Sequence, residues 1–571
     1  MTTTNLFTNN AASVLASGIT AVATSLSVTT GTGSLFPAPA ALQQYSATLV
    51  SIATGFVEIV LVSARISDTF TVTRAQGGTT ALAFSAGDRV ELRLTAGNAT
   101  YFDAKTNPAD LAASSGATLV GVIATTTGAV ARTVASKLND NKTPNDRGAL
   151  TDGASDDYAA LQNSATDGDM MLNKGTSLIS TGLSFTQPVY LRGRGPKSVI
   201  AISTTFPAAS DLFTLSPATG VEKRNWGFER FQVTNAGTNA RDVFLIDLTT
   251  AGKYLSKLTI KGIVSDQVTN KFVELLNPTN LDGLFSCVFE DNWSMNGYYL
   301  SNVGDSVVLQ RNIVSGIGVA FYISQLATAS HVILRDNNLT SAGGALSSDS
   351  SINLTFEENQ VEVTPTFTGA NNAAVGLSGA TAISHFNPRF THNNINCQSN
   401  ATLTCVSIDW ALNAQIDDNS LYCNPTTGSH IVVGSGCQDT YIGINRYFSS
   451  ADGSLITQRI TDNGLGTKGI WKDAALATWT DTDTTNEALT GFFKERDDVV
   501  SLRGRLNGAS STVGQVLFTL PVRFRPAKVV ILFVSNGSAQ VGLQILPTGT
   551  VELLTAGVFS ISLNAITFST Q

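Results

Sequence analysis

Three acidic residues in the second half of the chain have a spacing that suits the cleavage of a glycosidic bond. Asp349 lies in "GALSSDS" and Asp409 in "VSIDWA", two segments at corresponding places of a repeating pattern. Segments two repeats apart in a stack of parallel strands are separated by roughly 10 Å at the backbone. An inverting glycosidase holds its carboxyl groups roughly 6.5 to 9.5 Å apart, so that a water molecule fits opposite the leaving oxygen. We therefore predict Asp409 as general acid and Asp349 as general base, with Glu357 or Glu358 as the reserve carboxylate.

Polar and aromatic residues at the same places of neighbouring repeats suit a sugar chain. Trp410 offers a ring that can desolvate the adjacent Asp409 and stack on the C–H face of a sugar. His385 is predicted between the two Asp residues, where it would hold a sugar hydroxyl. Asn302 and Gln325 carry amides at the corresponding positions of earlier repeats. An ordinary hydrated surface explains the same residues, and the sequence leaves both interpretations open.

The repeat that positions these residues is marked by an asparagine. An apolar residue, two further residues and an Asn recur seven times at intervals of 20 to 34 residues. The Asn residues are Asn292, Asn312, Asn337, Asn359, Asn393, Asn419 and Asn445. This period is typical of stacked units that each bury one face, and no apolar pattern of period 3.6 favours a helical repeat. We predict an all-β protein built around a right-handed parallel β-helix.

The recurring asparagine is predicted to mark an inward corner of each coil. Asn tolerates the left-handed backbone conformation, and its amide can hydrogen-bond to the Asn above and below. Such a ladder is structural, because it leaves no amide free for a ligand. Phe231 and Leu258 stand where the Asn is expected in earlier coils, so the solenoid begins before its ladder.

Composition shifts divide the chain into four parts. Residues 1–98 contain short β-strands and turns, and residues 99–142 form a Ser/Gly/Thr linker with an amphipathic helix at residues 129–138. The β-helix occupies residues 143–465, with a first coil from Val189 and a helix near Tyr158, capped by Asp156, that covers its open end. Residues 466–571 alternate strands and turns at the spacing of a β-sandwich.

The overall composition excludes several classes of function. Charged residues make up 14% of the chain and the net charge is −8, so no basic stripe is available for nucleic acid. We expect no membrane insertion, because no apolar run of 18 residues occurs, and no secretory signal, because the start of the chain lacks a basic segment before an apolar one.

Cysteine and acidic residues give no pattern of a metal site. The five cysteines include no CxxC pair, and Cys397 and Cys423 both lie four residues after a ladder Asn, so we predict buried free thiols. The acidic residues beside the ladder alternate with Arg311 and His392, which is typical of a solvated edge. We therefore expect no metal and no cofactor.

One segment resembles a known family. "DRGALTDGASDDYAAL" at residues 146–161, followed by "KGTSLIS", resembles the opening of the pectate-lyase-like domain of bacteriophage tailspikes. Arg147, Lys174 and Ser177 depart from that pattern, where an aromatic residue, Pro and Tyr are usual. Residues 1–98 look like an attachment module of phage tail proteins, "SSGATLVGVIATTTGAVARTVASKL" looks like a tailspike neck, and the last hundred residues look like a fibre-tip or carbohydrate-binding sandwich.

This resemblance implies a function and a set of partners. It implies a homotrimer in the virion tail, made in the host cytoplasm and acting at the host cell surface. The N-terminal domain would bind phage baseplate or tail proteins, and the β-helix would bind and cleave a surface polysaccharide such as O-antigen or capsule. A non-enzymatic receptor-binding tail fibre is the alternative, and a secreted pectinase-like enzyme is a third class, which the expected absence of a secretory signal disfavours.

Overall fold

The fold is described from a computed structural model. It describes residues 4–570 except for 106–111, 114, 141, 208, 219–223, 236–240, 251–253, 266–269, 278–282, 317, 326–330, 342, 364–371, 380–381, 398–402, 457, 471, 474–475, 478–479, 482–489, 496, 509–510, 536–539, 558–559 and 565. The chain divides into two compact units, residues 1–140 and 141–571. No helix of the described residues has the length and apolar character needed to cross a membrane.

The N-terminal unit contains an antiparallel β domain with its own core. Its strands are β1 (Thr4–Asn5), β2 (Ala12–Val14), β3 (Ser25–Ser27), β4 (Gln43–Val50), β5 (Val57–Ile66), β6 (Thr69–Gln76) and β7 (Arg89–Glu91), with the 3-10 helix η1 (Gly33–Leu35). Tyr45 and Phe70 pack in the core. The buried Glu58 carboxylate pairs with the Arg74 guanidinium at 2.7 Å, which satisfies both charges.

The helix predicted in the linker is shorter than expected, and two other helices precede it. Its elements are α1 (Ala96–Lys105), α3 (Gly116–Leu119), the hairpin strands β8 (Gly121–Val122) and β9 (Arg132–Thr133), and α4 (Val134–Leu138). The helix predicted over residues 129–138 therefore covers only its last five residues, because residues 132–133 pair with β8. Thr133 caps α4, since its side chain accepts a hydrogen bond from the Ser136 N–H at 3.0 Å.

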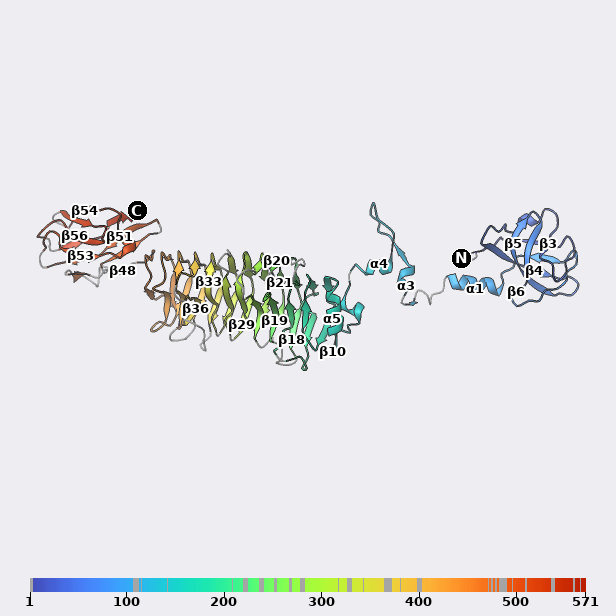
Figure 1. The fold of residues 1–571 in the computed structure, drawn as a ribbon, viewed down its shortest axis with the longest axis horizontal. Coiled ribbons are helices and arrows are strands. Elements are labelled where there is room, and N and C mark those ends of the chain that lie inside the picture. Colours follow the sequence, from blue (N-terminus) through green and yellow to red (C-terminus); the bar gives the residue numbers. More distant parts are fainter. Residues whose placement is uncertain are drawn as a thin grey trace. The chain divides into compact units, whose positions relative to one another are not determined.

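The second unit is dominated by a right-handed parallel β-helix, whose strands stack coil upon coil (Figure 1). One sheet contains β13 (Leu183–Phe185), β16 (Phe213–Leu215), β19 (Asp242–Asp247), β23 (Lys271–Leu276), β27 (Tyr298–Val303), β30 (Phe321–Gln325), β33 (Leu346–Ile352), β36 (Ala373–Leu377), β40 (Thr404–Ile408), β44 (Ser429–Val433) and β47 (Ile460–Asp462), with β37 (His385–Phe386) and β41 (Ala411–Leu412) beside them. We call it the 13-stranded sheet, and its strands and turns carry the predicted site residues except the reserve carboxylates Glu357 and Glu358.

Two further sheets complete each coil. The 11-stranded sheet contains β11 (Asp169–Met171), β14 (Tyr190–Arg192), β17 (Gly227–Glu229), β21 (Thr259–Lys261), β25 (Val288–Glu290), β28 (Val307–Gln310), β31 (Val332–Arg335), β34 (Thr355–Glu357), β38 (Arg389–Thr391), β42 (Gln415–Asp417) and β45 (Tyr441–Ile442). The 12-stranded sheet contains β10 (Asp152–Asp156), β12 (Gly175–Ile179), β15 (Ser198–Ile202), β18 (Gln232–Asn235), β22 (Val264–Ser265), β26 (Trp293–Ser294), β29 (Ile313–Gly316), β32 (Asn338–Ser341), β35 (Gln360–Val363), β39 (Asn394–Asn396), β43 (Ser420–Cys423) and β46 (Arg446–Ser449). A short pair, β20 (Leu255–Ser256) and β24 (Leu284–Phe285), lies outside these sheets.

The start of the solenoid differs from the sequence-based expectation. β10 and β12 already pair in parallel, so the coils begin before Val189. The 3-10 helix η2 (Pro144–Arg147) and α5 (Tyr158–Ala165) precede and cover the first coils, and Leu161 of α5 is fully buried in the solenoid core. Asp157 is the N-cap residue rather than Asp156, although the Asp156 carboxylate accepts a hydrogen bond from the Tyr158 N–H at 3.1 Å.

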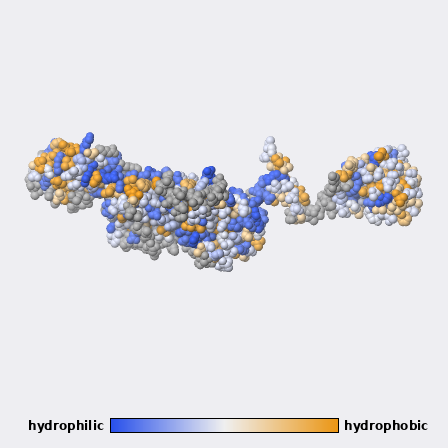
Figure 2. Space-filling view, viewed as in Figure 1, coloured by the Kyte–Doolittle hydropathy of each residue, from blue (hydrophilic) through white to orange (hydrophobic). Residues whose placement is uncertain are grey.

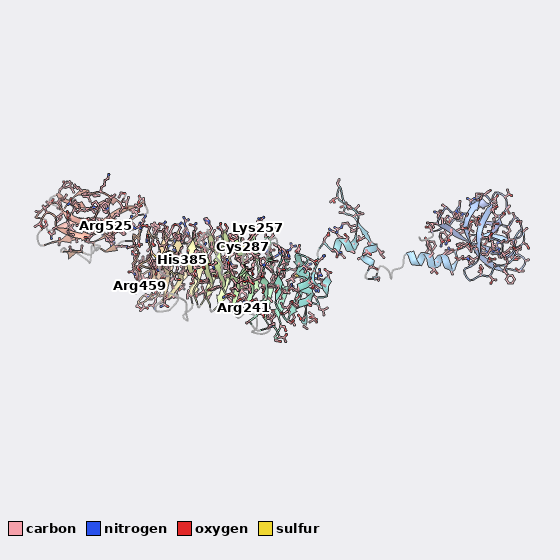
Figure 3. All side chains as sticks on the ribbon, in the orientation of Figure 1. Arg241, Lys257, Cys287, His385, Arg459 and Arg525 are labelled. Atoms are coloured by element: carbon pink, nitrogen blue, oxygen red, sulfur yellow. The ribbon has the colours of Figure 1, made fainter. Side chains whose placement is uncertain are left out.

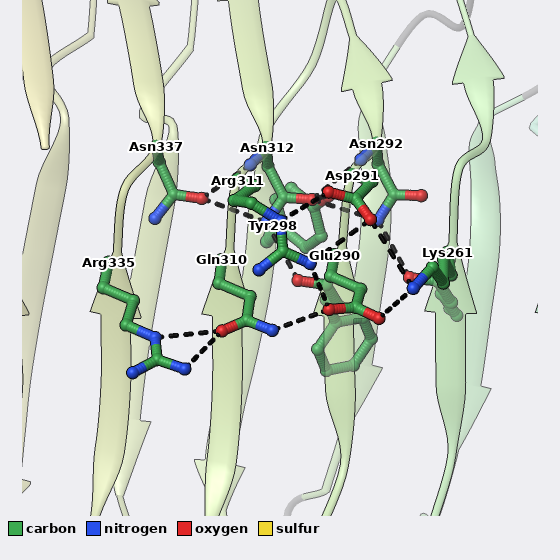
Figure 4. A network of polar contacts seen from close by, with 12 residues as sticks. Lys261, Glu290, Asp291, Asn292, Tyr298, Gln310, Arg311, Asn312, Arg335 and Asn337 are labelled. Atoms are coloured by element: carbon green, nitrogen blue, oxygen red, sulfur yellow. Dashed lines mark hydrogen bonds and ion pairs between the residues drawn. The ribbon is translucent and has the colours of Figure 1, made fainter.

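The asparagine ladder forms a buried corner between the 11-stranded and 12-stranded sheets (Figure 4). The Asn337 Oδ1 accepts hydrogen bonds from the Asn312 backbone N–H and Nδ2 at 2.9 and 3.1 Å. The Asn312 Nδ2 also donates to the Phe289 carbonyl oxygen at 2.9 Å, and the same pattern continues along the row. We call the seven residues the inner asparagine ladder, and each of its amides is engaged within the protein.

Two details of the corner correct the prediction. The left-handed conformation falls on the exposed residue before six of the seven ladder Asn residues, as in Arg311 and Glu358 with φ of 53° and 57°. The Asn side chain points into the coil, where its amide forms hydrogen bonds with the neighbouring coils. In the coil before the ladder, the Ile263 N–H donates to the Asn292 Oδ1, so Ile263 rather than Leu258 occupies the ladder position.

The outward face beside the ladder carries paired charges (Figure 4). The Glu290 carboxylate accepts hydrogen bonds from the Lys261 Nζ at 2.7 Å and the Gln310 amide at 2.6 Å. Arg311 pairs with Asp291 at 2.7 Å. This edge is a network of exposed ion pairs, as the alternating signs in the sequence indicate.

All five cysteines are buried free thiols, as predicted. The Sγ atoms of Cys397 and Cys405 lie 3.5 Å apart inside the solenoid. Burial raises the pKa of the Cys423 thiol to about 11 and that of Cys437 to about 11, so these thiols remain protonated and unreactive.

The C-terminal region is an antiparallel β-sandwich with a separate core. Its sheets are β48 (Lys472–Asp473), β50 (Gly491–Lys494), β51 (Val499–Arg503) and β58 (Ile566–Ser569); β49 (Thr480–Asp481), β52 (Arg505–Asn507) and β57 (Ser560–Ser562); and β53 (Val516–Thr519), β56 (Thr550–Leu553), β55 (Gln540–Ile545) and β54 (Val530–Ser535), with the 3-10 helix η4 (Val522–Phe524). Leu502, Phe518 and Leu543 are buried in its core. Figure 2 shows hydrophobic patches on the surfaces of both the N-terminal and the C-terminal β domains.

Candidate functional site

The two predicted catalytic carboxylates occupy the same bend of the solenoid. Asp349 lies within β33 and Asp409 directly after β40, with β36 between the two strands. Ser348 is in register with Leu377, and Leu377 with Ile408, so the two carboxylates are two coils apart. The residue at this bend in the intervening coil is Ser378. The sequence alignment placed Ser384 there, but Ser384 precedes β37 further along the coil. We call Asp349, Ser378 and Asp409 the polar bend.

Asp349 is exposed and is held by a phenol. Its carboxylate accepts a hydrogen bond from the Tyr322 hydroxyl at 2.7 Å. Burial and this hydrogen bond raise the pKa of Tyr322, so the phenol stays protonated and acts as a donor. The Tyr322 ring stacks on Tyr299 with centroids 4.0 Å apart, and the Lys271 Nζ lies 4.1 Å from the Tyr299 centroid. The Asp349 carboxylate is thus exposed to solvent and is held in place by the stacked rings of Tyr322 and Tyr299.

Asp409 is half-buried and shapes a turn. One carboxylate oxygen accepts hydrogen bonds from the backbone N–H groups of Trp410 and Gly436 at 2.9 and 3.2 Å. The half-buried Trp410 has a φ of 51°, and its ring lies flat against Gly436, where an added Cβ would be 2.4 Å from the indole. Glycine is therefore required at position 436, and the Trp410 ring covers the turn that Asp409 organises.

His385, which is labelled in Figure 3, lies on the coil between those of Asp349 and Asp409 and is fully buried. Its Nε2 donates to the Ser378 carbonyl oxygen at 2.9 Å, so its Nδ1 accepts from the Ser351 hydroxyl at 2.8 Å. Burial lowers the pKa of His385, while the charges of Asp349 and Asp409 act in the opposite direction. Both carboxylates therefore act on one neutral imidazole, whose ring nitrogens already have partners within the protein.

The remaining predicted residues have partners elsewhere. The Asn302 Nδ2 donates to the backbone carbonyl oxygen of Asn277 in the preceding coil at 2.5 Å, and the Asn277 Nδ2 donates to that of Asn302 at 3.0 Å. The buried Gln325 amide bonds both the N–H and the carbonyl oxygen of Ile352. Glu358 is exposed at the ladder corner, beyond β34 from the polar bend. The structure thus brings Asp349, Asp409, Trp410 and His385 together and places Glu358 on another edge.

A cluster of five charged residues on the 13-stranded sheet was missed by the sequence analysis. Arg241 pairs with Asp211 at 2.8 Å and with Asp242 at 3.1 Å, and its guanidinium lies 3.8 Å from Glu274. Lys271 pairs with Glu274. Three carboxyl groups thus share two cations, which leaves one negative charge in excess. We call these residues the charged cluster, and Arg241 is labelled in Figure 3.

A shared proton relieves that excess charge. Burial, followed by the hydrogen bond and charge of Glu274, raises the pKa of Asp242 to about 7. Burial also acts to raise the pKa of Glu274, but hydrogen bonds from Asp242 and Lys271 hold it below its ordinary value. Opposite shifts in a carboxyl pair are a feature of acid–base sites. Here Asp242 is fully buried, so the pair braces the coils rather than reaching a substrate.

A signal for this cluster is present in the sequence. "RDVFLID" and "KFVELL" each place a basic residue and a carboxylate on consecutive strands. The repeat alignment began with the segment before Asn312, so it reached neither of these earlier segments. Within the described residues, no group of three His, Cys, Asp or Glu side chains has an arrangement that holds a metal ion.

The fold and site define a right-handed parallel β-helix protein in which the exposed Asp349 and the half-buried Asp409 and Trp410 lie around the buried His385. No protein-family model matches the sequence, and no curated protein does. Similar solved structures include the A-module of the Azotobacter vinelandii mannuronan C-5 epimerase AlgE6, with 15% identity and a TM-score of 0.40 over 58% of this chain and 100% of that one. The enzymatically active domain of tailspike protein 2 from bacteriophage CBA120 has 13% identity and a TM-score of 0.37 over 78% and 72%. A double mutant of the tailspike of E. coli bacteriophage HK620, in complex with a pentasaccharide, has 12% identity and a TM-score of 0.36 over 80% and 99%.

Proposed function

We propose that this chain is a phage tailspike that attaches the virion to a bacterial host by binding and cleaving a surface polysaccharide. The observation that carries the proposal is the polar bend, where Asp349 and Asp409 lie two coils apart and act on the same buried imidazole. Coils spaced about 4.8 Å apart put their backbones roughly 10 Å from each other. From that backbone separation, the two side chains can bring their carboxyl groups to the spacing of an inverting pair.

In the proposed reaction, each residue of the bend has one role. Asp349 removes a proton from a water molecule, which attacks the anomeric carbon, and Asp409 protonates the leaving oxygen. The Tyr322 hydroxyl fixes the Asp349 carboxylate, and the Trp410 ring shields Asp409 from water. His385 positions the bend through Ser351 and Ser378 and does not contact the sugar.

The test measures reducing ends released from purified host polysaccharide. We expect Asp409→Asn and Asp349→Asn each to lower the rate by about 100-fold or more while binding is retained. The matched control is Asp336→Asn, which alters an exposed carboxylate at the ladder corner and is expected to leave the rate unchanged. Equal losses in all three variants would contradict the assignment of Asp349 and Asp409. Products with unsaturated ends that absorb in the ultraviolet would show that the reaction is an elimination and not a hydrolysis.

A non-enzymatic receptor-binding fibre is the second candidate. One observation favours it: an Asp409 carboxylate oxygen is already engaged by two backbone N–H groups, as in a purely structural turn. A wild-type protein that binds host polysaccharide but releases neither reducing nor unsaturated ends would establish this alternative.

We further propose a homotrimer in the virion tail, with residues 1–98 attached to baseplate or tail proteins. Exposed apolar side chains support assembly: Val130 and Leu138 of the linker are 77% and 66% exposed, and Phe533 on the edge strand β54 is 69% exposed. Such surface favours burial against identical chains. A monomer in sedimentation velocity would contradict the trimer, and deletion of residues 1–98 is expected to abolish virion incorporation without loss of polysaccharide binding.

A further inference from the structure

A second groove runs along the solenoid where the 13-stranded sheet passes into the 11-stranded sheet. Its volume is about 440 Å³, within the range of small-molecule sites. It extends from His331 to Lys468 over six successive coils, which corresponds to roughly 24 Å along the axis. Its lining is predominantly amides, hydroxyls and charged groups, and none of the predicted site residues contributes to it.

Three stacked asparagines form the floor of this groove. Asn353, Asn387 and Asn413 occupy left-handed positions at the corner, with φ of 50°, 52° and 55°. The Asn413 Nδ2 donates to the Asn387 Oδ1 at 3.2 Å, and the Asn387 Nδ2 donates to the Asn353 Oδ1 at 3.1 Å. Each amide has two N–H donors, so Asn387 and Asn413 each retain one for a ligand. We call these residues the outer asparagine row.

A free guanidinium stands beside this row. Arg389 is exposed at the start of β38, in register with Thr355 and Gln415. Among the described residues it has no ion pair and no side-chain hydrogen bond. Arg311 and Arg335, on the same sheet, are both engaged by neighbouring side chains.

Other charges of the groove cancel one another. Asp439 pairs with Arg523 at 3.0 Å, and Lys468 pairs with Asp498 at 2.7 Å. Arg389 is therefore the charge without an ion-pair partner among the described lining residues. An exposed Arg fork is suited to a carboxylate, which it binds through two parallel hydrogen bonds.

We propose that this groove is a second carbohydrate site, which binds an acidic oligosaccharide through a carboxylate on Arg389 and hydroxyl groups on the outer asparagine row. Amides donate to and accept from sugar hydroxyls, and the elongated groove follows an extended chain. The site lies on a different part of the coil from the polar bend, which carries the proposed catalytic residues. We therefore expect it to hold a saccharide without cleaving it. It would keep the virion on an acidic surface glycan between successive cleavage events.

The test uses oligogalacturonate and oligosialate as probes, each with its carboxyl-reduced counterpart, and measures affinity by isothermal titration calorimetry. We expect at least one acidic probe to bind the full-length protein, and carboxyl reduction or Arg389→Gln to weaken that binding about tenfold or more. The matched control is Arg335→Gln, which removes a guanidinium from the same sheet outside the groove and is expected to leave the affinity unchanged. Asn387→Ala provides a second groove variant.

The proposal is overturned if no acidic probe binds, if carboxyl-reduced probes bind equally well, or if Arg389→Gln and Arg335→Gln have the same effect. Asp409→Asn separates this site from the proposed cleavage. Retained probe binding in that variant supports two sites, whereas loss of probe binding there with no effect of Arg389→Gln assigns the binding to the polar bend.

Discussion

The chain carries two rows of asparagine that differ in position by six residues and behave in opposite ways. Asn359, Asn393 and Asn419 of the inner ladder follow Asn353, Asn387 and Asn413 of the outer row at that constant offset. The inner amides are buried and saturated, whereas the outer amides are more accessible and bonded only along their own row. Residue type and spacing are the same, so burial and backbone conformation distinguish the structural ladder from the row that we propose as a binding surface.

The strongest way to break this comparison is to remove one amide from each row. Asn337→Ala leaves the Asn312 N–H and Nδ2 without this acceptor. It also removes the Nδ2 donor to the Asn359 Oδ1, which keeps only the backbone N–H of residue 337. Buried unpaired polar groups cost about 1–3 kcal/mol each, so we expect a loss of roughly 3 kcal/mol in the free energy of unfolding. Asn387→Gly is the control, because glycine keeps the left-handed conformation of this position, and its expected change is within about 1 kcal/mol. Equal losses in guanidinium denaturation would remove the distinction between the rows.

The charged cluster sharpens the comparison, because its Asp242 is fully buried although Arg241 of the same cluster is 36% exposed. Asp242 has a folded-state pKa of about 7, and an unfolded Asp titrates near about 3.9. The folded chain therefore retains a proton that the unfolded chain releases, so this contribution to stability is complete below about pH 4 and is lost as the pH rises through about 7. Glu274, with a lowered pKa, contributes in the opposite sense, and its contribution is lost as the pH falls below its ordinary value.

We expect Asp242→Asn to flatten the fall in stability between about pH 4 and pH 7. Urea denaturation at several pH values measures this slope for the wild type and the variant. Asp291→Asn, which alters an exposed carboxylate on the solenoid surface, serves as the control with an unchanged slope. A variant whose slope matches that of the wild type would show that Asp242 is ionised in the folded protein.

The smallest effect is expected at the exposed ion pairs beside the ladder. The Arg311 side chain is 43% exposed and pairs with Asp291 and Glu290 (Figure 4). Exposed pairs contribute about 0–1 kcal/mol and are screened by salt, so Arg311→Gln should lower the free energy of unfolding by less than about 1 kcal/mol. A loss as large as that of Asn337→Ala would place this network among the elements that hold the coils together.

The sequence by itself determined the repeating architecture. The ladder spacing predicts parallel coils. The corner has a constant length in each repeat, so the inward Asn and the flanking apolar residues lie at the same positions in successive coils. For the same reason it predicted that Cys397 and Cys423 are buried. The β-sandwich and the N-terminal β domain follow from the alternation of strands and turns.

Only the tertiary structure decided which residues share a face beyond that corner. The segments between the 12-stranded and 13-stranded sheets vary in length, so counting from the ladder Asn loses register and aligned Ser384 where Ser378 stands. Asp349 faces outward because the register of β33 shifts at this point. His385 is buried because its side chain on β37 points inward. Six separate coils form the groove at Arg389. The exposure of its lining residues depends on the side chains that pack beside them, which cannot be predicted from the spacing of residues in the sequence.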